Sequence, residues 1–317
     1  MADIKSYLLC GMVNFHRNAQ DQKALLFFQE GLKLLQGDTQ KTKISSGILP
    51  QLLHQNQWRG QLICYLHAYL AFLSAVAGEW STTKRNISKV EGMANAFGVA
   101  LTGVLGSTTQ YLKGVHSQGT GDLNTAIQSF EDGMFDLSGK RSAHPTFSEN
   151  LQRDIALLAV LNKLSILQVA TKRDAELNSS ILKTLKPLCE NHPNQEITIA
   201  YYLLLAMIKQ SPDATMFEIK RNLKSALNGA QAKANFQFTC ITLNVMGSRF
   251  FTDNVGPQAE KSAQAALATA NKTGNPLWKS VAEGMLGDCL LRQGRVAEGQ
   301  ERLQAARSLS SMAFPHS

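Results

Sequence analysis

The strongest constraint on the fold of this chain is a spacing of small and large residues that recurs along it. Seven positions after Gly114 comes the glycine Gly121, and twelve positions after it comes the small residue Ala126. The large residue Phe130 follows at sixteen positions and Gly133 at nineteen. Small residues at fixed places in two successive helices allow close approach, a large residue fills the space beside them, and glycine makes the turn. The spacing therefore predicts antiparallel pairs of helices.

Three other segments of the chain have the same pattern. At the same four distances after Gly287 stand a turn glycine, a small residue, a large residue and a second small residue: Gly294, Gly299, Leu303 and Ala306. A looser copy begins at Ala71, and a copy with one extra turn residue runs from Gly11 to Gly31. Such a pattern, with a period of about 34 residues, is typical of tetratricopeptide (TPR) repeats. The clearest repeats are predicted at residues 4–36, 64–96, 107–138 and 280–311.

The rest of the chain is predicted to be helical without clean repeats. Helices are expected at residues 147–171, 175–190, 194–209, 213–232, 236–252, 257–273 and 275–293. Most prolines fall in the connections, where a missing N–H costs little, and only Pro187 lies late within a helix, which it should kink or shorten. Residues 37–47 and 138–146 are the longest expected loops. The predicted fold is all-α: a TPR-like α-solenoid of antiparallel helix pairs, in one superhelical domain over residues 1–317.

Composition agrees with a helical chain that buries a core. Of the 317 residues, 44% are hydrophobic and 18% are charged, which excludes disorder by composition. The five cysteines are far apart and form no C-x-x-C pair, so reduced thiols in a cytosolic or nuclear protein fit better than disulfides or a metal site. The chain opens without a secretory signal, and its longest apolar stretches are shorter than the ~20 residues of a membrane span. We therefore expect a soluble intracellular chain with no membrane partner.

The net charge of +8 is spread over both ends of the chain, without a dense basic run. It permits contact with nucleic acid or with an acidic peptide. Solvated helical faces explain the same charge and are the favoured interpretation.

Sequence patterns for catalysis are missing. Gly103–Thr109 resembles a phosphate loop, but its spacing is wrong and it contains no lysine. No pair of histidines has the H-E-x-x-H spacing of a zinc helix, and no G-x-S-x-G elbow occurs. His67 lies on a mostly apolar helix, so a hydrogen-bonded histidine in the core or in a groove is expected. The chain is predicted not to be an enzyme and to need no cofactor or metal.

A solenoid of helix pairs is suited to binding an extended peptide along its first helices. Six first-helix positions are expected to face such a groove: Tyr65, Ala68, Phe72, Thr108, Tyr111 and Val115. Their aromatic rings could anchor a peptide or pack against the neighbouring repeat, and the sequence leaves both open. No first helix pairs Lys and Asn as a clamp for a terminal carboxylate, which favours an internal peptide segment over a chaperone tail.

Residues 250–270 could be read as an anion-binding turn, because Gly256-Pro257 precedes charged residues. A helix start explains them better. Pro257 fits a first helical turn, and Glu260 lies near the positive end of the helix dipole. Small residues at spacings of four, three and four then allow a neighbouring helix to pack closely: Ala259, Ala263, Ala266 and Ala270.

Five segments of the sequence resemble the TPR subunit of the cohesin loader. They read GMVNFHRNAQDQKALLFFQEGLK, GVHSQGTGDLNTAIQSFED, CENHPNQEITIAYYLLLA, CITLNVMGSRFFTDNVGPQAEKSAQAA and GNPLWKSVAEGMLGDCLLRQGR. The likeness extends over residues 4–305. The fourth segment is the most specific, because TPR packing alone does not require its Phe-Phe, Val-Gly and Gln-Ala-Glu-Lys-Ser-Ala string.

The resemblance implies a non-enzymatic scaffold in the nucleus, associated with chromatin. It implies a heterodimer with the large HEAT-repeat loader subunit, whose N-terminal region would thread through the TPR superhelix. The complex would load cohesin onto chromatin and support sister-chromatid cohesion, with DNA reached through the complex. The family has a longer helical block before Gly11, so the chain is expected to correspond to the C-terminal half of its architecture. Gly247-Ser248 stands where the family leads us to expect a large aromatic residue.

Five residues are selected as candidates for partner binding because they are aromatic or polar-tipped and fall near first-helix positions: Tyr65, Tyr111, Asn244, Arg249 and Trp278. Trp278 follows a proline at a helix start, so a role as a core anchor is also open. Two other functions remain: a generic TPR adaptor or co-chaperone, expected from the repeat spacing alone, and direct nucleic-acid binding, expected from the charge.

Overall fold

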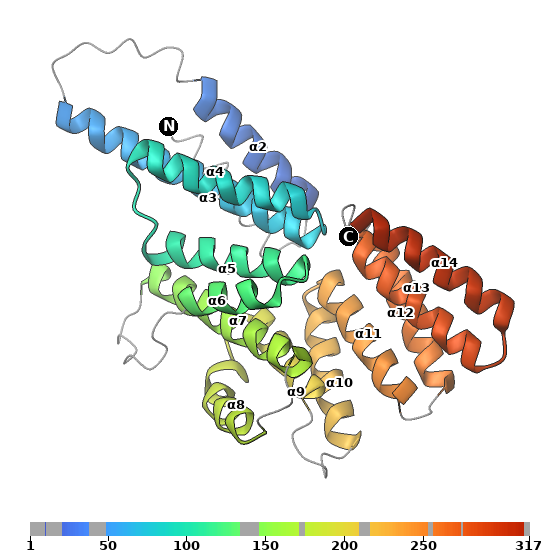
Figure 1. The fold of residues 1–317 in the computed structure, drawn as a ribbon. Helices are drawn as coiled ribbons and strands as arrows, with labels where there is room; N and C mark the ends of the chain where they lie inside the picture. Colours follow the sequence, from blue (N-terminus) through green and yellow to red (C-terminus); the bar gives the residue numbers. More distant parts are fainter. Residues whose placement is uncertain are drawn as a thin grey trace. The chain divides into compact units, whose positions relative to one another are not determined.

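The computed structural model describes residue 10 and residues 21–37, 49–133, 146–170, 175–208, 216–252, 256–273 and 275–313. The regular elements in these ranges are all α-helices (Figure 1), so the all-α prediction is confirmed. The first six are α2 (Asp21–Gly37), α3 (Leu49–Val76), α4 (Trp80–Phe97), α5 (Gly103–Gly119), α6 (Leu123–Asp132) and α7 (Phe147–Ala170). They are followed by α8 (Ala175–Cys189), α9 (Gln195–Met207), α10 (Met216–Ala232), α11 (Phe236–Thr252), α12 (Gly256–Thr273), α13 (Pro276–Arg292) and α14 (Val296–Ala313).

The helices group into two compact units. The first holds α2 to α6, except Val76–Gly78 at the end of α3, and α7 up to Ala159; the second holds Val76–Gly78 and α7 from Val160 through α14. In the first unit α4 packs on α5 and α5 on α6; in the second, each helix from α9 to α13 packs on the next one along the chain. One superhelical domain over residues 1–317, and the assignment of the pairs to the TPR class, stay predictions.

Three turns between paired helices share one backbone geometry. Gly78, Gly121 and Gly294 have φ angles of 77°, 86° and 79°, in the left-handed region that glycine adopts without steric cost. The residue after each glycine donates its N–H to the carbonyl five positions earlier, at 2.8, 2.9 and 3.0 Å respectively, as in a Schellman motif. Each glycine stands seven positions after the small residue that opens its repeat. The turn chemistry expected from the spacing is therefore present.

Close approach of paired helices occurs where the spacing places small residues. A Cβ atom added to Gly114 would lie 2.5 Å from a ring carbon of Phe130, which is fully buried. A Cβ atom added to Gly287 would lie 3.0 Å from the Gly299 carbonyl oxygen and 2.9 Å from a carbon of Leu303. Real Cβ contacts are almost never this short, so both helix pairs depend on glycine at these positions.

A hydrogen bond from the first helix of a pair to the main chain of the second recurs in three pairs. Its donor and acceptor are 26 residues apart each time: Cys64 and Val90, Cys240 and Ala266, Ser280 and Ala306. The donor-to-oxygen distances are 3.5, 3.5 and 2.8 Å. Because the separation is constant, the three pairs have one register.

The α11–α12 pair is a copy of the spacing that the sequence analysis missed, because a small residue, Ala263, replaces the large one. A Cβ atom added to Gly247 would lie 3.3 Å from Met285 Cγ and within 4 Å of the main chain at Ala259 and Ala263. That space cannot take the large aromatic residue expected near this point. The predicted stripe on α12 is confirmed, since its four alanines are fully buried: Ala259, Ala263, Ala266 and Ala270.

The helices expected from residue 147 to residue 293 are found with ends within three residues of the prediction. Pro187 lies near the end of α8, which still runs to Cys189. Asparagine side chains cap three helices: Asn194 Oδ1 accepts the N–H of Glu196 at 3.1 Å, Asn235 Oδ1 that of Phe238 at 3.0 Å, and Asn275 Oδ1 that of Leu277 at 2.9 Å. Gly11, and nearly all of the loops expected at 37–47 and 138–146, fall outside the described residues.

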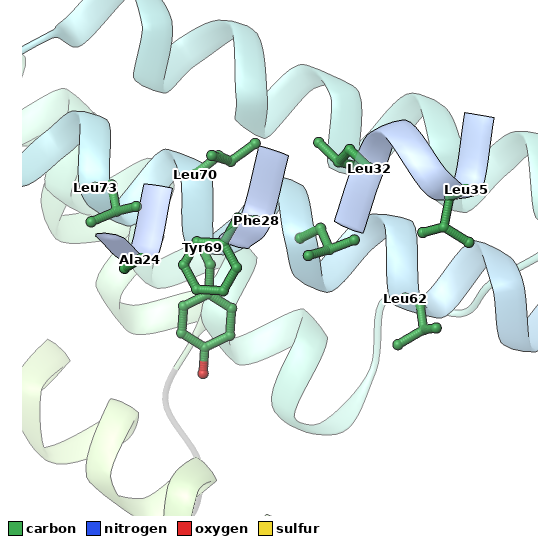
Figure 2. Close-up of a cluster of buried hydrophobic side chains, with 9 residues drawn as sticks. Ala24, Phe28, Leu32, Leu35, Leu62, Tyr69, Leu70 and Leu73 are labelled. Atoms are coloured by element: carbon green, nitrogen blue, oxygen red, sulfur yellow. The ribbon is translucent and has the colours of Figure 1, made fainter. Parts of the chain in front are cut away.

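The core of the first unit contains a continuous row of aromatic rings. Phe28 of α2 stacks on Tyr69 of α3, with ring centroids 5.1 Å apart (Figure 2). Tyr69 and Phe72 are 6.2 Å apart, Phe72 and Tyr111 5.9 Å, and Tyr111 and Phe130 5.8 Å. Offset aromatic pairs at these distances stabilise a core beyond the burial of their surface. The row joins α2, α3, α5 and α6.

Across the described ranges, no helix combines the length and the apolar character that crossing a bilayer requires.

Substituting Gly114 with alanine should destabilise the chain. The added methyl group would overlap the buried ring of Phe130, and overpacking of this kind costs about 1–3 kcal/mol. The matched control is Gly92→Ala on α4, because a Cβ atom there meets nothing within 4 Å. That control should gain about 0.5–1 kcal/mol from helix propensity. Urea unfolding followed by circular dichroism measures both, and equal effects of the same sign would contradict the packing described.

Candidate functional site

The five candidate residues lie in both units. Tyr65 is on α3 and Tyr111 on α5, in the first unit, whereas Asn244 and Arg249 are on α11 and Trp278 is on α13, in the second. The structure therefore presents them as two separate sets.

In the first set, Tyr111 is a core residue. It is buried, and its ring lies between those of Phe72 and Phe130. Tyr65 is half-buried and packs on the α3–α4 core that contains Cys64. Burial and the nearby Cys64 raise the pKa of the Tyr65 hydroxyl. Of the two roles left open by the sequence, Tyr111 has the packing role, and Tyr65 keeps a partly accessible face.

In the second set, Asn244 and Trp278 meet around one buried thiol. Trp278 is half-buried and packs on a cluster that includes Cys240 and Ala282. Asn244 is 6% exposed, and its Nδ2 lies 3.5 Å from Cys240 Sγ. Arg249 instead contacts α9, since its guanidinium donates to the Met207 carbonyl at 2.5 Å.

The Oδ1 atom of Asn244 is buried and has no hydrogen-bond partner in the part of the chain that the structure describes. A buried carbonyl oxygen without a donor costs free energy relative to its hydrated state. Asn244 thus uses its Nδ2 but leaves a buried Oδ1 that no described residue satisfies.

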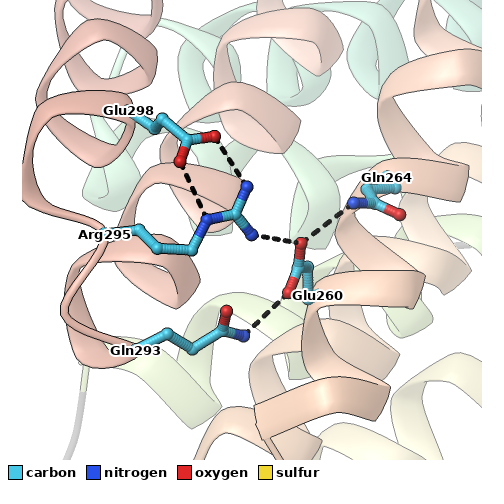
Figure 3. A network of polar contacts seen from close by, with 5 residues as sticks. All are labelled: Glu260, Gln264, Gln293, Arg295 and Glu298. Carbon is cyan, nitrogen blue, oxygen red and sulfur yellow. Dashed lines mark hydrogen bonds and ion pairs between the residues drawn. The ribbon is translucent and has the colours of Figure 1, made fainter.

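A network around Glu260 was missed by the sequence analysis, which assigned this residue only a helix-dipole role. Glu260 of α12 accepts hydrogen bonds from Gln264 at 3.0 Å, Gln293 at 2.8 Å and Arg295 at 3.1 Å (Figure 3). Arg295 also donates to both carboxylate oxygens of Glu298, at 3.0 and 2.6 Å. Gln293 and Arg295 belong to the turn between α13 and α14, so Glu260 ties that turn to α12.

A second ion pair joins α13 to α14. The carboxylate of Glu283 is buried, and Arg302 lies 3.3 and 3.2 Å from its two oxygens. The two residues are nineteen positions apart on different helices, a separation that no local sequence signal marks. Two arginines of the second unit, Arg295 and Arg302, are therefore paired with carboxylates of the same unit.

His67 is a buried, hydrogen-bonded core residue, which is one of the two roles predicted for it from the sequence. His67 is buried, and its Nδ1 lies 3.1 Å from Asn86 Oδ1. Asn86 Nδ2 donates to the Thr82 carbonyl at 3.1 Å, so its Oδ1 faces the ring and Nδ1 must carry the proton. Burial lowers the pKa of His67, which keeps the ring neutral.

The buried cysteines are protonated. Burial raises the pKa of Cys64 and of Cys240 to about 11, and that of Cys189 to about 12. The cysteines that the structure describes are free thiols, and its described residues contain no cluster of three or more His, Cys, Asp or Glu side chains able to hold a metal ion. The thiols of Cys64 and Cys240 donate hydrogen bonds to main-chain carbonyls of the neighbouring helices.

Comparison with known proteins decides the family. The family model described as cohesin loading factor matches residues 5–297. The chain belongs to the cohesin loading factor family. A search of curated proteins gives no match. Family membership supports a role in cohesin loading and in sister-chromatid cohesion. It also confirms the resemblance found in the five sequence segments, the most specific of which contains Asn244 and Glu260.

Replacing His67 with glutamine should make the stability of this chain less sensitive to mild acid. Burial lowers the pKa of His67 below its ordinary value of 6.5, the hydrogen bond with Asn86 opposes that shift, and Lys89 adds to it. The unfolded chain therefore binds this proton more readily than the folded chain. The stabilisation is complete above pH 6.5 and is lost as the pH falls below it.

Urea unfolding at pH 8.5, 7.5 and 5.5 tests the role of His67. Wild type should lose more stability than His67→Gln between pH 7.5 and 5.5, and the two should change in parallel between pH 8.5 and 7.5. Parallel change over the whole range would contradict the assignment.

Glu260→Ala should weaken the second unit by about 1 kcal/mol, since Gln264 and Gln293 lose an acceptor and Arg295 keeps only Glu298. Glu298→Ala is the matched control, because it removes an exposed partner of the same arginine and should have little effect. Hydrogen exchange in the α13–α14 turn should rise in the first variant only. An equal rise in both would show that the tie to α12 does not stabilise the turn.

Proposed function

We propose that this chain is a non-catalytic scaffold subunit of the cohesin-loading complex. It would sheathe the extended N-terminal region of the large HEAT-repeat loader subunit, and so support cohesin loading onto chromatin in the nucleus. The observation that supports the proposal most is the family match over residues 5–297, joined to an all-helical repeat architecture.

Stacked helix pairs suit this task for a physical reason. Each pair adds its own surface to that of its neighbour, so the contact with an extended segment grows with the number of pairs. An extended segment pays conformational entropy when it is ordered, and many small contacts can offset that cost. Within this proposal, Tyr65, Asn244, Arg249 and Trp278 contribute partner contacts from first helices, and Tyr111 holds the α5 backbone in place by packing.

DNA contact in this proposal belongs to the assembled complex. The runner-up is a generic TPR adaptor or co-chaperone, which the helix-pair geometry would also allow. It predicts micromolar binding of a short acidic C-terminal peptide. Direct DNA binding by this chain predicts a gel shift that weakens steeply with salt.

The test is affinity purification of the full chain with the N-terminal region of the large loader subunit from the same organism. Retention of that region is expected, with no competition from an acidic C-terminal peptide and no DNA shift at moderate salt. Failure to retain it, together with binding of the acidic peptide, would replace this proposal with the adaptor function.

A variant pair refines the same measurement. Tyr65→Ala should weaken retention by about tenfold or more if the ring is an anchor, as interface aromatics typically do. Lys261→Ala, at an exposed position on α12, should bind as wild type does. If wild type, Tyr65→Ala and Lys261→Ala bind with equal affinity, Tyr65 does not contribute to the interface.

A further inference from the structure

The outer face of α4 carries three cations that no described residue neutralises. The buried residues of this helix recur every three or four positions and form one face: Thr83, Asn86, Ile87, Val90 and Ala94. The opposite face is exposed and contains Lys84, Arg85 and Lys89. Within the described ranges, none of these three forms an ion pair. Two turns of one helix therefore present three positive charges to solvent.

The acidic residues near this face do not cancel its charge. Glu79 lies before the first turn of α4, and its side chain caps no helix N–H. Glu91 lies at the edge of the face and is paired with Lys113 of α5, with 2.6 Å between Oε1 and Nζ. Burial and the charge of Lys84 lower the pKa of His116 on α5, which keeps that ring neutral. The α5 side of the face thus adds no net negative charge.

The rest of the outer face is built from short side chains. They belong to five exposed residues: Ser81, Ser88, Gly92, Asn95 and Ala96. A Cβ atom added to Gly92 meets nothing within 4 Å, so the described chain leaves this stretch of the helix uncovered. From Ser81 to Asn95 the face is about 21 Å long. A polyanion can therefore approach the helix closely along several turns.

The chemistry of this face fits phosphate better than protein. Lysine, arginine, serine and asparagine side chains supply many of the contacts that proteins make with DNA phosphates. Binding to a protein partner depends chiefly on aromatic and other large side chains that fill pockets. The exposed residues of this face include none of that kind. Contacts to phosphate alone carry no information about base sequence.

We propose that the outer face of α4 binds the phosphate backbone of duplex DNA through Lys84, Arg85 and Lys89, without reading its sequence. The inference goes beyond the proposed function, which assigns DNA contact to the assembled complex, and it is testable on the chain alone. Three phosphate contacts are too few to hold DNA at moderate salt, which agrees with the absence of a gel shift expected there. In the loading complex they would add to the contacts of the other subunits.

The first experiment measures the salt dependence of DNA binding by the full chain, from the fluorescence anisotropy of a labelled duplex below about 100 mM salt. Each phosphate contact contributes about 0.9 to the slope of log affinity against log salt. The triple variant Lys84→Gln, Arg85→Gln, Lys89→Gln should lower the slope by about 2–3 and the affinity by about tenfold or more. Two duplexes of unrelated sequence should give the same result.

The matched control replaces three scattered, exposed cations of the second unit: Lys183→Gln, Lys261→Gln and Arg307→Gln. It removes the same net charge, so a general attraction between the chain and DNA would weaken equally in both triple variants. The slope of the control should stay within about one of the wild-type slope. Equal slopes of the two variants would show that net charge alone explains binding and would overturn the inference.

The second experiment adds a charge without removing a contact. Gly92→Glu places a carboxylate at the open position one turn after Ser88, and Gly92→Gln adds a side chain of the same size without the charge. Both should melt at or above the wild-type temperature, because glycine disfavours a helix interior. Only Gly92→Glu should bind DNA more weakly, by about three- to tenfold. Equal affinities of the two variants would contradict the inference.

An acidic protein is the alternative polyanion, and poly-glutamate is the probe for it. If the α4 triple variant loses affinity for poly-glutamate but keeps the wild-type affinity and salt slope for DNA, an acidic protein is the partner and the inference is wrong. The α4 triple variant should also retain the N-terminal region of the large loader subunit as wild type does. Failure of wild type to retain that region contradicts the proposed function and leaves the DNA measurements intact.

Discussion

The close approach of paired helices through small residues is the constraint on which the other contacts depend. Glycine at position 114 or 287 lets the second helix come near enough for a large residue to fill the space beside it. Only at that distance can a thiol or hydroxyl on one helix reach a main-chain carbonyl of the next, as Cys64, Cys240 and Ser280 do. Glycines with left-handed backbone angles then reverse the direction of the chain in the turns, so that the second helix runs back along the first.

Local sequence signals predicted most of the fold. The helices, their ends and the turn glycines follow from capping residues, prolines and small-residue spacing, all of which act over a few positions. Both helices of the α11–α12 pair were predicted, but the pair was not recognised as a copy of the repeat spacing, because Ala263 stands where a large residue was sought. The alanine stripe beside it was still predicted from spacing alone.

The candidate site was less accessible to prediction, because burial depends on which helices come to lie side by side. Tyr111 and Asn244 have similar positions in their repeats, yet one fills an aromatic core and the other has an unsatisfied oxygen. Glu260 was placed correctly at a helix start, but two of its three partners, Gln293 and Arg295, lie more than thirty residues away. No spacing rule marks such a contact. Membership of the cohesin loading factor family then supplies the biological context that the packing cannot.

The tie between Glu260 and the α13–α14 turn also has a mechanical consequence. It crosses from one helix pair to the next, because Glu260 belongs to α12 while Gln293 and Arg295 follow α13. A pull that separates these two pairs at this edge must break the carboxylate contacts before the helices can part. Adjacent pairs joined only by apolar side chains would slide or open under a smaller force. The contact between Arg249 of α11 and the Met207 carbonyl of α9 is a second polar tie between neighbouring helix pairs, so the second unit resists separation at more than one place.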